Sequence, residues 1–344
     1  MNQLLATWSR RILVVTIYVA LLAALLGFAV PLLLAAALAD AVRRQPWTAT
    51  RTLVFFAWYL LCELAGIAAS LLLWLGGGPW RGGNADLYQH RNFELQNWWT
   101  RMLGRGAFRV FDIELAAPEV QVVGGGDYRF GERPILLFVR HASTADTILA
   151  SLLLAVPYGM HFRYVLKREL LWDPCLDIVG NRLPNVFVRR DSAQTATEVA
   201  AVAKLADNLR AGEGVLIYPE GTRFSQSKRR RIVEKLRGEG REREAAEAEA
   251  LQHVLRPRSG GPLALLEAAP DTDVVFLAHT GFEGSASFDR FFNGGLIGKV
   301  VRTELRVVRA ADVPRDADQR RRWLLEQWQQ VDRFVSRWNP PGQG

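Results

Sequence analysis

The feature that most constrains this chain is the run from Ile12 to Ala39, which contains no charged side chain. A helix that crosses a bilayer needs about 20 consecutive apolar residues. Arg10 and Arg11 precede the run, which is too long for a signal sequence and lacks a good small-residue cleavage site. We therefore predict a retained membrane helix, with a kink at Pro31.

A second apolar stretch, Thr52 to Trp80, is interrupted by one acid, Glu63. The polar link 40–51 joins the two stretches, so residues 1–80 are predicted to form a membrane hairpin of two helices. Arginines lie before the first helix and also in the link. This leaves two arrangements open, a hairpin that crosses the bilayer and one embedded in a single leaflet. Glu63 is expected to be protonated or to meet water rather than to act in chemistry.

The net charge and the cysteines limit which partners and ligands the chain is expected to bind. The formal net charge of +8 suits a phospholipid surface or a phosphate-bearing substrate. We predict no nucleic-acid partner, because no recognition motif accompanies the charge and the membrane hairpin opposes one. Cys62 and Cys175 fit neither zinc spacing nor a disulfide framework, so no metal site is predicted. The oligomeric state has no signal in the sequence.

From about Arg109 onward, short apolar strands alternate with helices, which is typical of an α/β fold. This domain is predicted over residues 81–310. A basic amphipathic helix within 311–344 is expected to pack on it rather than on the membrane, and the charged segment 227–249 is expected to be solvated and partly helical. Strands are predicted at 110–115, 120–123, 134–140, 161–166, 186–189, 214–218 and 274–278, and helices at 88–103, 144–156 and 193–211.

A histidine and an aspartate follow the predicted strand 134–140. His141 stands at the strand exit, where ligands bind in α/β proteins. Asp146, in the first turn of the next helix, is positioned to bond one imidazole nitrogen, which leaves the other free to take a proton from a hydroxyl. Ser143 and Asp146 also fit a capping box, and the two roles are compatible.

Two further polar segments follow predicted strands, FVRR at 187–190 and YPEGTR at 218–223. Guanidinium groups and hydroxyls are suited to phosphate oxygens, and glycine lets the backbone approach a ligand closely. In the second segment, Glu220 is expected to position the substrate or to order the turn. The candidate substrate-binding residues are Arg189, Arg190, Glu220, Gly221, Thr222 and Arg223.

Taken in order, HASTAD at 141–146, FVRR and YPEGTR resemble the motifs of the glycerolipid acyltransferase family, which has an HxxxxD motif. The resemblance covers about residues 85–290. The segment LRPRSG at 255–260 is similar to one in the longer subgroup that acts on lysophosphatidic acid, lysophosphatidylinositol or lysocardiolipin. One departure is the apolar strand at 274–281, which lacks the family's proline and carries His279. We expect His279 to be packed rather than to touch substrate.

The resemblance implies a mixed central sheet flanked by helices and transfer of a fatty acyl group from acyl-CoA or acyl carrier protein to a lysophospholipid. The acceptor implied is 1-acylglycerol 3-phosphate, giving phosphatidic acid. His141 would be the base and Asp146 its orienting partner, with backbone N–H groups near the helix start stabilising the oxyanion. No cofactor or metal is implied. The partners are the acceptor, the thioester donor and the bilayer, and the catalytic domain is expected on the cytoplasmic face of a bacterial inner membrane.

Three alternatives stay open. The first keeps the chemistry and changes the acceptor to lysocardiolipin, lysophosphatidylinositol or glycerol 3-phosphate. The second is a hydrolase that uses water as acceptor. The third is a non-catalytic lipid-binding membrane protein, which the intact pair His141 and Asp146 disfavours.

Overall fold

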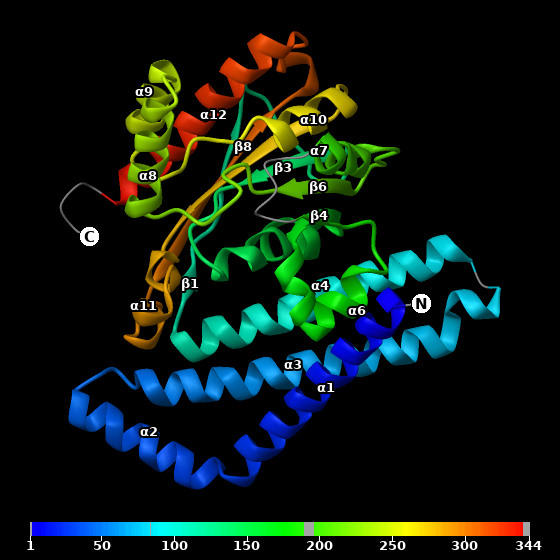
Figure 1. The fold of residues 1–344 in the computed structure, drawn as a ribbon, viewed down its shortest axis with the longest axis vertical. Coiled ribbons are helices and arrows are strands. Elements are labelled where there is room, and N and C mark those ends of the chain that lie inside the picture. The colour runs from blue at the N-terminus through cyan, green and yellow to red at the C-terminus, as the bar shows by residue number, and fades with distance from the viewer. Residues whose placement is uncertain (1, 83, 189–195, 340–344) are drawn as a thin grey trace.

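The computed structural model describes residues 2–82, 84–188 and 196–339, and Figure 1 shows their arrangement. Eight strands form one mixed sheet in the order β1-β8-β7-β3-β6-β4-β5, with β2 beside β8. All pairings are parallel except that of β7 with β8. The strands are β1 (Glu114–Leu115), β2 (Glu119–Val122), β3 (Ile135–Val139), β4 (His161–Lys167), β5 (Val186–Val188), β6 (Glu213–Ile217), β7 (Asp273–Thr280) and β8 (Val300–Val308).

Helices cover both faces of the sheet, which confirms the predicted α/β class. One face packs against α7 (Ala196–Ala203), α10 (Gly260–Ala268) and α12 (Ala317–Trp338). The other packs against α4 (Ala85–Phe111) and the short helical turns η2 (Ala145–Ile148), η3 (Ser151–Ala155) and α5 (Val156–Tyr158). The remaining segments are η1 (Pro79–Arg81), η4 (Arg168–Trp172), α6 (Pro174–Gly180), η5 (Lys204–Ala206), α8 (Gln226–Gly238), α9 (Glu242–Ala250), η6 (Glu283–Ser285), α11 (Phe288–Phe292) and η7 (Ala310–Asp312).

The helix α12 packs on the α/β domain, as its apolar stripe predicts. Trp328 is fully buried, and its indole N–H donates to the carbonyl of Leu255 at 3.1 Å. Trp323 meets Phe276 of β7 edge-on, with ring centroids 5.6 Å apart. The charged segment expected to be a partly helical excursion forms the hairpin of α8 and α9, which buries only a small apolar cluster of its own.

Several elements of the α/β domain differ from the sequence-based expectation. Residues 110 and 111 end α4 rather than begin a strand, because Phe111 completes that helix's buried apolar face. The helix expected at 144–156 is instead a 3₁₀ turn followed by a π-helical turn. The strand β8 was not predicted. Its residues are all buried or partly buried, without the regular alternation of exposed and buried positions that marks a strand in a sequence.

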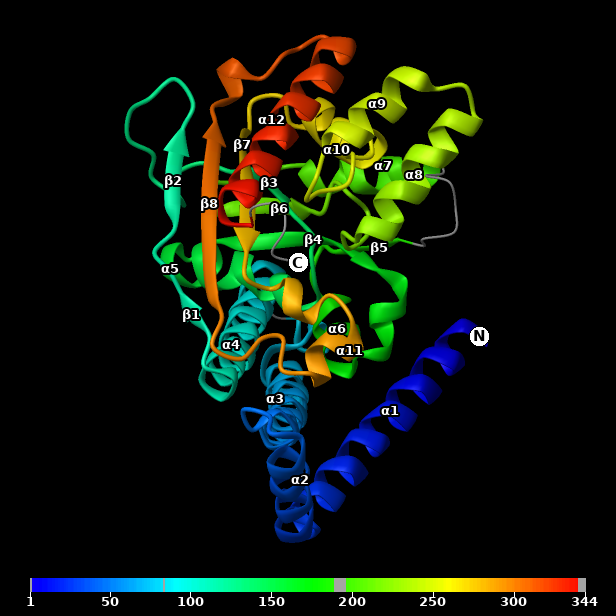
Figure 2. The same ribbon diagram turned by 90° about the vertical axis from the view of Figure 1, so that its left-hand side faces the viewer.

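The N-terminal segment contains three helices rather than two: α1 (Asn2–Gly27), α2 (Ala29–Arg43) and α3 (Thr48–Gly77). The first apolar run breaks at Phe28, and Pro31 lies in the first turn of α2, where its missing N–H costs no helical hydrogen bond. Two of the helices, α1 and α3, are long and apolar enough to cross a bilayer. In Figure 2, α1 and α2 meet at the end of the molecule farthest from the sheet.

Candidate active site

The site lies at one edge of the sheet, where three adjacent strands end. The register pairs Phe138 with Ile217 and Val139 with Leu277, so β3, β6 and β7 finish side by side. His141 follows the wholly buried strand β3, and the segment that starts at Tyr218 follows β6. This is the edge at which parallel α/β sheets bind ligands.

The predicted hydrogen bond between His141 and Asp146 is present. Nδ1 of His141 lies 3.0 Å from Oδ1 of Asp146. The imidazole is 15% exposed, whereas the carboxylate is fully buried. The ring of Tyr218 packs against the imidazole, with centroids 4.4 Å apart. Among the described residues, Nε2 of His141 has no hydrogen-bond partner, so it is available to accept a proton from a bound hydroxyl.

Asp146 is held as an acceptor from several sides. Its Oδ2 accepts the backbone N–H groups of Ala142 and Ser143, each at 2.7 Å, and Nε2 of His279 lies 3.5 Å away. Burial alone would raise the pKa of Asp146, but the charges and hydrogen bonds of His141 and His279 outweigh it and hold the pKa well below its usual range. The carboxylate therefore stays ionised while the imidazole changes its charge.

The same contacts limit which backbone amides could stabilise the oxyanion. The amides of Ala142 and Ser143 bond to Asp146, and the amide of Ala145 donates to Oγ of Ser143 at 3.1 Å. Half of the expected capping box is present, since Asp146 accepts from Ser143, whereas Ser143 accepts from Ala145 instead of Asp146. These three N–H groups are engaged and do not form an oxyanion hole.

Glu220 joins three chain segments at the site. Its Oε1 accepts the N–H of His141 and its Oε2 accepts the N–H of Leu255, both at 2.8 Å. The side chain is 2% exposed, and burial raises its pKa to about 8 against these hydrogen bonds. Of the two roles expected for Glu220, this geometry favours ordering the turn and fixing the backbone of His141.

The segment after Glu220 supplies two further predicted residues, Thr222 and Arg223, which bond to neighbouring side chains. Nη1 of Arg223 donates to Oγ1 of Thr144 at 2.8 Å. Nζ of Lys228 donates to Oγ1 of Thr222 at 3.0 Å and to the carbonyl of Arg223 at 2.8 Å. Arg189 and Arg190, the candidate phosphate ligands after β5, lie outside the described residues.

A cavity of about 180 Å³ opens beside His141. Its walls are mostly apolar, and two cations line it, Lys167 and Arg258. Lys167 pairs with Glu169 at 2.8 Å, whereas the guanidinium of Arg258 has no hydrogen bond or ion pair among the described residues. We did not predict Arg258 as a site residue, although it lies in the LRPRSG segment. The N–H of Arg258 donates to the carbonyl of Pro219 at 2.9 Å, and this backbone bond places Arg258 beside the site.

His279, expected to be packed, is fully buried beside the site. Its Nε2 lies 2.9 Å from the carbonyl of Arg140, the residue before His141. Arg140 is itself buried, and it donates to the carbonyl of His279 at 2.7 Å and to Oε1 of Glu283 at 2.8 Å. This network anchors the end of β3 and therefore the backbone that carries the imidazole.

Gly221→Ala is expected to weaken substrate binding. Gly221 has φ +68°, and a Cβ there would lie 2.7 Å from Nε of Arg258. The left-handed backbone costs an alanine about 1 kcal/mol, and the methyl group displaces the guanidinium from the cavity. We expect a higher KM for the acceptor with a smaller change in kcat. Gly212→Ala is the matched control, since Gly212 has φ +79° with no side chain nearby. Equal KM values in the two variants would contradict this account.

The fold and this geometry define a class of protein, an α/β protein with a histidine–carboxylate pair at the carboxyl edge of its sheet. The sequence model of a protein family described as Acyltransferase matches residues 119–269. No curated protein matches the chain. The match, which covers less than half of the chain, supports acyl transfer in general. The matched span contains His141, Asp146 and Glu220, and the N-terminal helices lie outside it.

Proposed function

We propose that the chain transfers a fatty acyl group from acyl-CoA or acyl carrier protein to the free hydroxyl of a lysophospholipid. The acceptor we favour is 1-acylglycerol 3-phosphate, and the product is phosphatidic acid. The observation that carries the proposal is the bond between Nδ1 of His141 and Asp146, which leaves Nε2 free beside a mostly apolar cavity whose charged lining residues are Lys167, Glu198 and Arg258. An acidic headgroup and a nucleophilic hydroxyl are the two features that such a cavity recognises.

The mechanism follows from the orientation of His141 and Asp146. Nε2 of His141 takes the proton from the acceptor hydroxyl, and the alkoxide attacks the thioester carbonyl. The tetrahedral intermediate collapses with cleavage of the carbon–sulfur bond, and the thiolate leaves with the proton from the imidazolium. Asp146 remains ionised throughout and stabilises the imidazolium. No acyl-enzyme forms in this scheme.

The cations around the cavity supply the headgroup contacts. Arg258 and Lys167 line it, and Arg223, two residues after the lining Gly221, donates to Thr144. At about 180 Å³ the cavity is smaller than the roughly 300–1,000 Å³ of common small-molecule sites. It therefore encloses the reacting part of the substrates, and the remainder of each lipid extends outside it. Because three of the amides near the helix start are engaged, the cationic side chains are further candidates for stabilising the oxyanion.

A lysolipid panel tests the proposal. The detergent-purified full-length chain is supplied with radiolabelled acyl-CoA and, in turn, 1-acylglycerol 3-phosphate, lysocardiolipin, lysophosphatidylinositol or glycerol 3-phosphate. We expect the highest kcat/KM with 1-acylglycerol 3-phosphate. A preference for another lipid would correct the acceptor only. Release of free fatty acid without any acceptor would indicate a hydrolase, and lipid binding without turnover would contradict catalysis.

The arrangement of the N-terminal helices indicates how the protein contacts the bilayer. Both ends of the segment contact the α/β domain: Arg10 and Arg11 bond Asp177 at 2.9 and 3.0 Å, and Arg51 in α3 donates to the carbonyl of Val110 at 2.7 Å. The chain from α1 through α2 must therefore leave the α/β domain and return to it. With 15 residues, α2 is about 22 Å long, which is shorter than the roughly 30 Å hydrocarbon core.

The helix α3 lies along the α/β domain instead of leaving it. The carboxyl group of Glu63 is fully buried and accepts the N–H of Cys175 at 3.2 Å. Tyr59 donates to Asp173 at 3.0 Å, and the carbonyl of Ser70 accepts from Arg182 at 2.9 Å. These bonds hold α3 against the domain, and Glu63 therefore contacts protein rather than lipid. We infer that α1 and α2 form a wedge embedded in one leaflet and that α3 lies beneath the domain.

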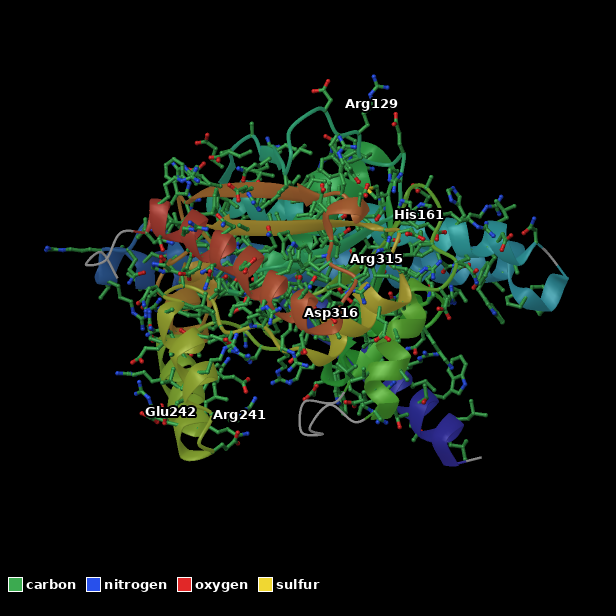
Figure 3. All side chains as sticks on the ribbon, turned by 90° about the horizontal axis from the view of Figure 1, so that it is seen from above. Arg129, His161, Arg241, Glu242, Arg315 and Asp316 are labelled. Carbon is green, nitrogen blue, oxygen red and sulfur yellow. The ribbon has the colours of Figure 1, made fainter. Side chains whose placement is uncertain are left out.

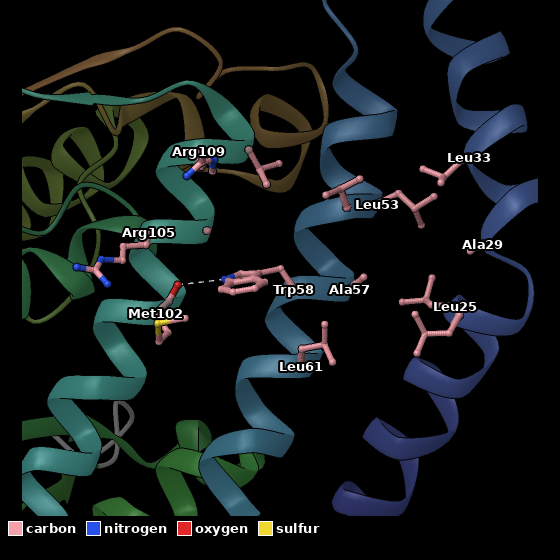
Figure 4. A pocket seen from close by; sticks show the side chains of 14 residues that line it. Leu25, Ala29, Leu33, Leu53, Ala57, Trp58, Leu61, Met102, Arg105 and Arg109 are labelled. Atoms are coloured by element: carbon pink, nitrogen blue, oxygen red, sulfur yellow. Dashed lines mark hydrogen bonds between the residues drawn. The ribbon is translucent and has the colours of Figure 1, made fainter. Parts of the chain in front are cut away.

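The wedge leaves an apolar groove for lipid chains. Figure 4 shows Leu25, Ala29 and Leu33 facing Leu53, Ala57 and Leu61 across it. The groove has a volume of about 650 Å³ and is lined almost entirely by apolar side chains. Trp58 and residues of α4 also line it, and the indole N–H of Trp58 donates to the carbonyl of Met102 at 3.1 Å. A groove of this kind is stable against a bilayer and would be costly in water.

Labelling of single introduced cysteines distinguishes a wedge from a crossing hairpin. Both native cysteines are buried. In membrane vesicles of known sidedness we expect Gln45→Cys, in the link between α2 and α3, to react with an impermeant maleimide from the same side as Glu132→Cys in the α/β domain. Phe28→Cys, at the tip of the wedge, should react from neither side. Labelling of residue 28 from the opposite side would show that α1 crosses the bilayer.

A further inference from the structure

A second cluster of chemically active side chains lies away from His141. His90 and Glu94 are on the first turns of α4, and His161 is the first residue of β4. His161 pairs with Glu213 at the start of β6, so the cluster is at the amino edge of the parallel strands. His141 follows the carboxyl end of β3 and is therefore at the opposite edge. Figure 3 labels His161 on the side where the first turns of α4 emerge.

The three side chains converge on one point. His90 and Glu94 are four residues apart on a helix, so they share a face. Nε2 of His161 lies 3.1 Å from Oε1 of Glu94, and one ligand atom from each of the three residues lies within 4.8 Å of the others. Ligand atoms of a tetrahedral zinc ion, bound at roughly 2.0–2.1 Å, are about 3.3 Å apart. Small rotations of exposed side chains would therefore close the site.

The surroundings hold one of the ligands, His161, in place before an ion binds. The ring of Phe93 stacks on His161 with centroids 4.7 Å apart and planes 2° apart. The backbone N–H of His161 donates to the carbonyl of Gly212 at 2.8 Å. His90 meets His161 edge-on at 5.0 Å, and its imidazole has no hydrogen bond among the described residues. Glu94 is 56% exposed, so its carboxylate is free to turn toward an ion.

We propose that His90, Glu94 and His161 form a binding site for a divalent transition-metal ion, with zinc as the best fit. Two imidazoles and one carboxylate select zinc and its neighbours over magnesium or calcium, which prefer oxygen ligands only. The exposed side leaves the fourth position to water. The ion joins α4, which packs along α3, to the start of β4. Its effect is on stability, because the site is at the edge away from His141, and the proposal is independent of the acyl-transfer function.

The test uses the full-length protein in detergent after treatment with a chelator. Cobalt(II), a spectroscopic substitute for zinc, is titrated while visible absorption is followed, and zinc is then added in competition. We expect wild type to bind one equivalent, zinc to displace it, and zinc to raise Tm. His90→Ala, at an exposed position, should weaken binding by more than about tenfold and lose the Tm increase. His253→Ala, which removes a histidine outside the cluster, should behave as wild type.

Two results would overturn the proposal. One is the absence of cobalt binding by folded wild type. The other is binding and a Tm increase that His90→Ala and Glu94→Gln both retain. A rate of acyl transfer that is equal in wild type and His90→Ala supports the assignment, since the site is separate from His141. Loss of transfer in the chelated but folded wild type would instead contradict the independence of the two sites.

Discussion

Replacement of His141 by alanine is expected to reduce kcat/KM for acyl transfer by about 10²–10⁴-fold, the usual contribution of a general base. The acceptor hydroxyl would then have to lose its proton to water. The fold should survive, because the backbone bonds of residue 141 remain: its N–H donates to Glu220 at 2.8 Å and its carbonyl accepts from Phe224 at 2.7 Å. Asp146 also keeps both of its amide donors.

The measurement is the initial rate with radiolabelled acyl-CoA and the preferred lysolipid, at equal amounts of folded protein judged by Tm. His253→Ala is a suitable control, because the backbone of His253 holds Arg140 while its imidazole has no hydrogen bond among the described residues. Native rates in His141→Ala would remove the histidine from the mechanism. Loss of rate together with loss of the folded state would point to a structural role.

Asp146→Asn is expected to lower kcat about as strongly, by roughly 10³–10⁴-fold. The Oδ2 position must accept from the amides of Ala142 and Ser143, so the asparagine oxygen has to occupy it. The asparagine NH₂ would then face Nδ1 of His141 and donate to it. That bond selects the tautomer with its proton on Nε2, which cannot accept the hydroxyl proton. The base is lost although all atoms of the site keep nearly the same positions.

The effect of this variant should appear in kcat more than in the KM for the acceptor. A large change in KM with an unchanged kcat would show that Asp146 binds substrate instead. Stability supplies a second readout. Because the pKa of Asp146 is lowered in the fold, its ionised form stabilises the protein above the ordinary aspartate pKa of about 3.9, and this contribution is lost as pH falls below that value. The stability difference between wild type and Asp146→Asn should therefore shrink in acid.

Much of the candidate site could be predicted because its central pair is local. His141 and Asp146 are five residues apart, between a buried strand and a helical turn, so their contact depends on short-range geometry alone. The turn at Gly221 likewise depends on residues next to one another. The engagement of the nearby amides was missed, since a sequence does not show which acceptor takes each N–H group. The carboxylate of Asp146 takes two of them.

Residues that reach the site from distant segments could not be predicted by the same reasoning. Arg258 and His279 come from segments more than a hundred residues beyond His141, and they are brought close by the pairing of β7 with β3 and by a backbone bond to Pro219. The cluster of His90, Glu94 and His161 joins a helix to a strand in the same way. Its sequence spacing resembles no familiar metal motif, so only proximity in space identifies it.

The sequence by itself determined the apolar runs, the alternation of strands and helices, and the histidine–carboxylate pair, because hydrophobic periodicity and short-range hydrogen bonds act between residues that are near along the chain. Only the tertiary structure decided that the apolar segment folds back against the α/β domain, with Glu63 bonded to Cys175, and which cations surround His141. These features depend on packing between segments far apart in sequence, and burial and pairing in such contacts are set by the whole fold.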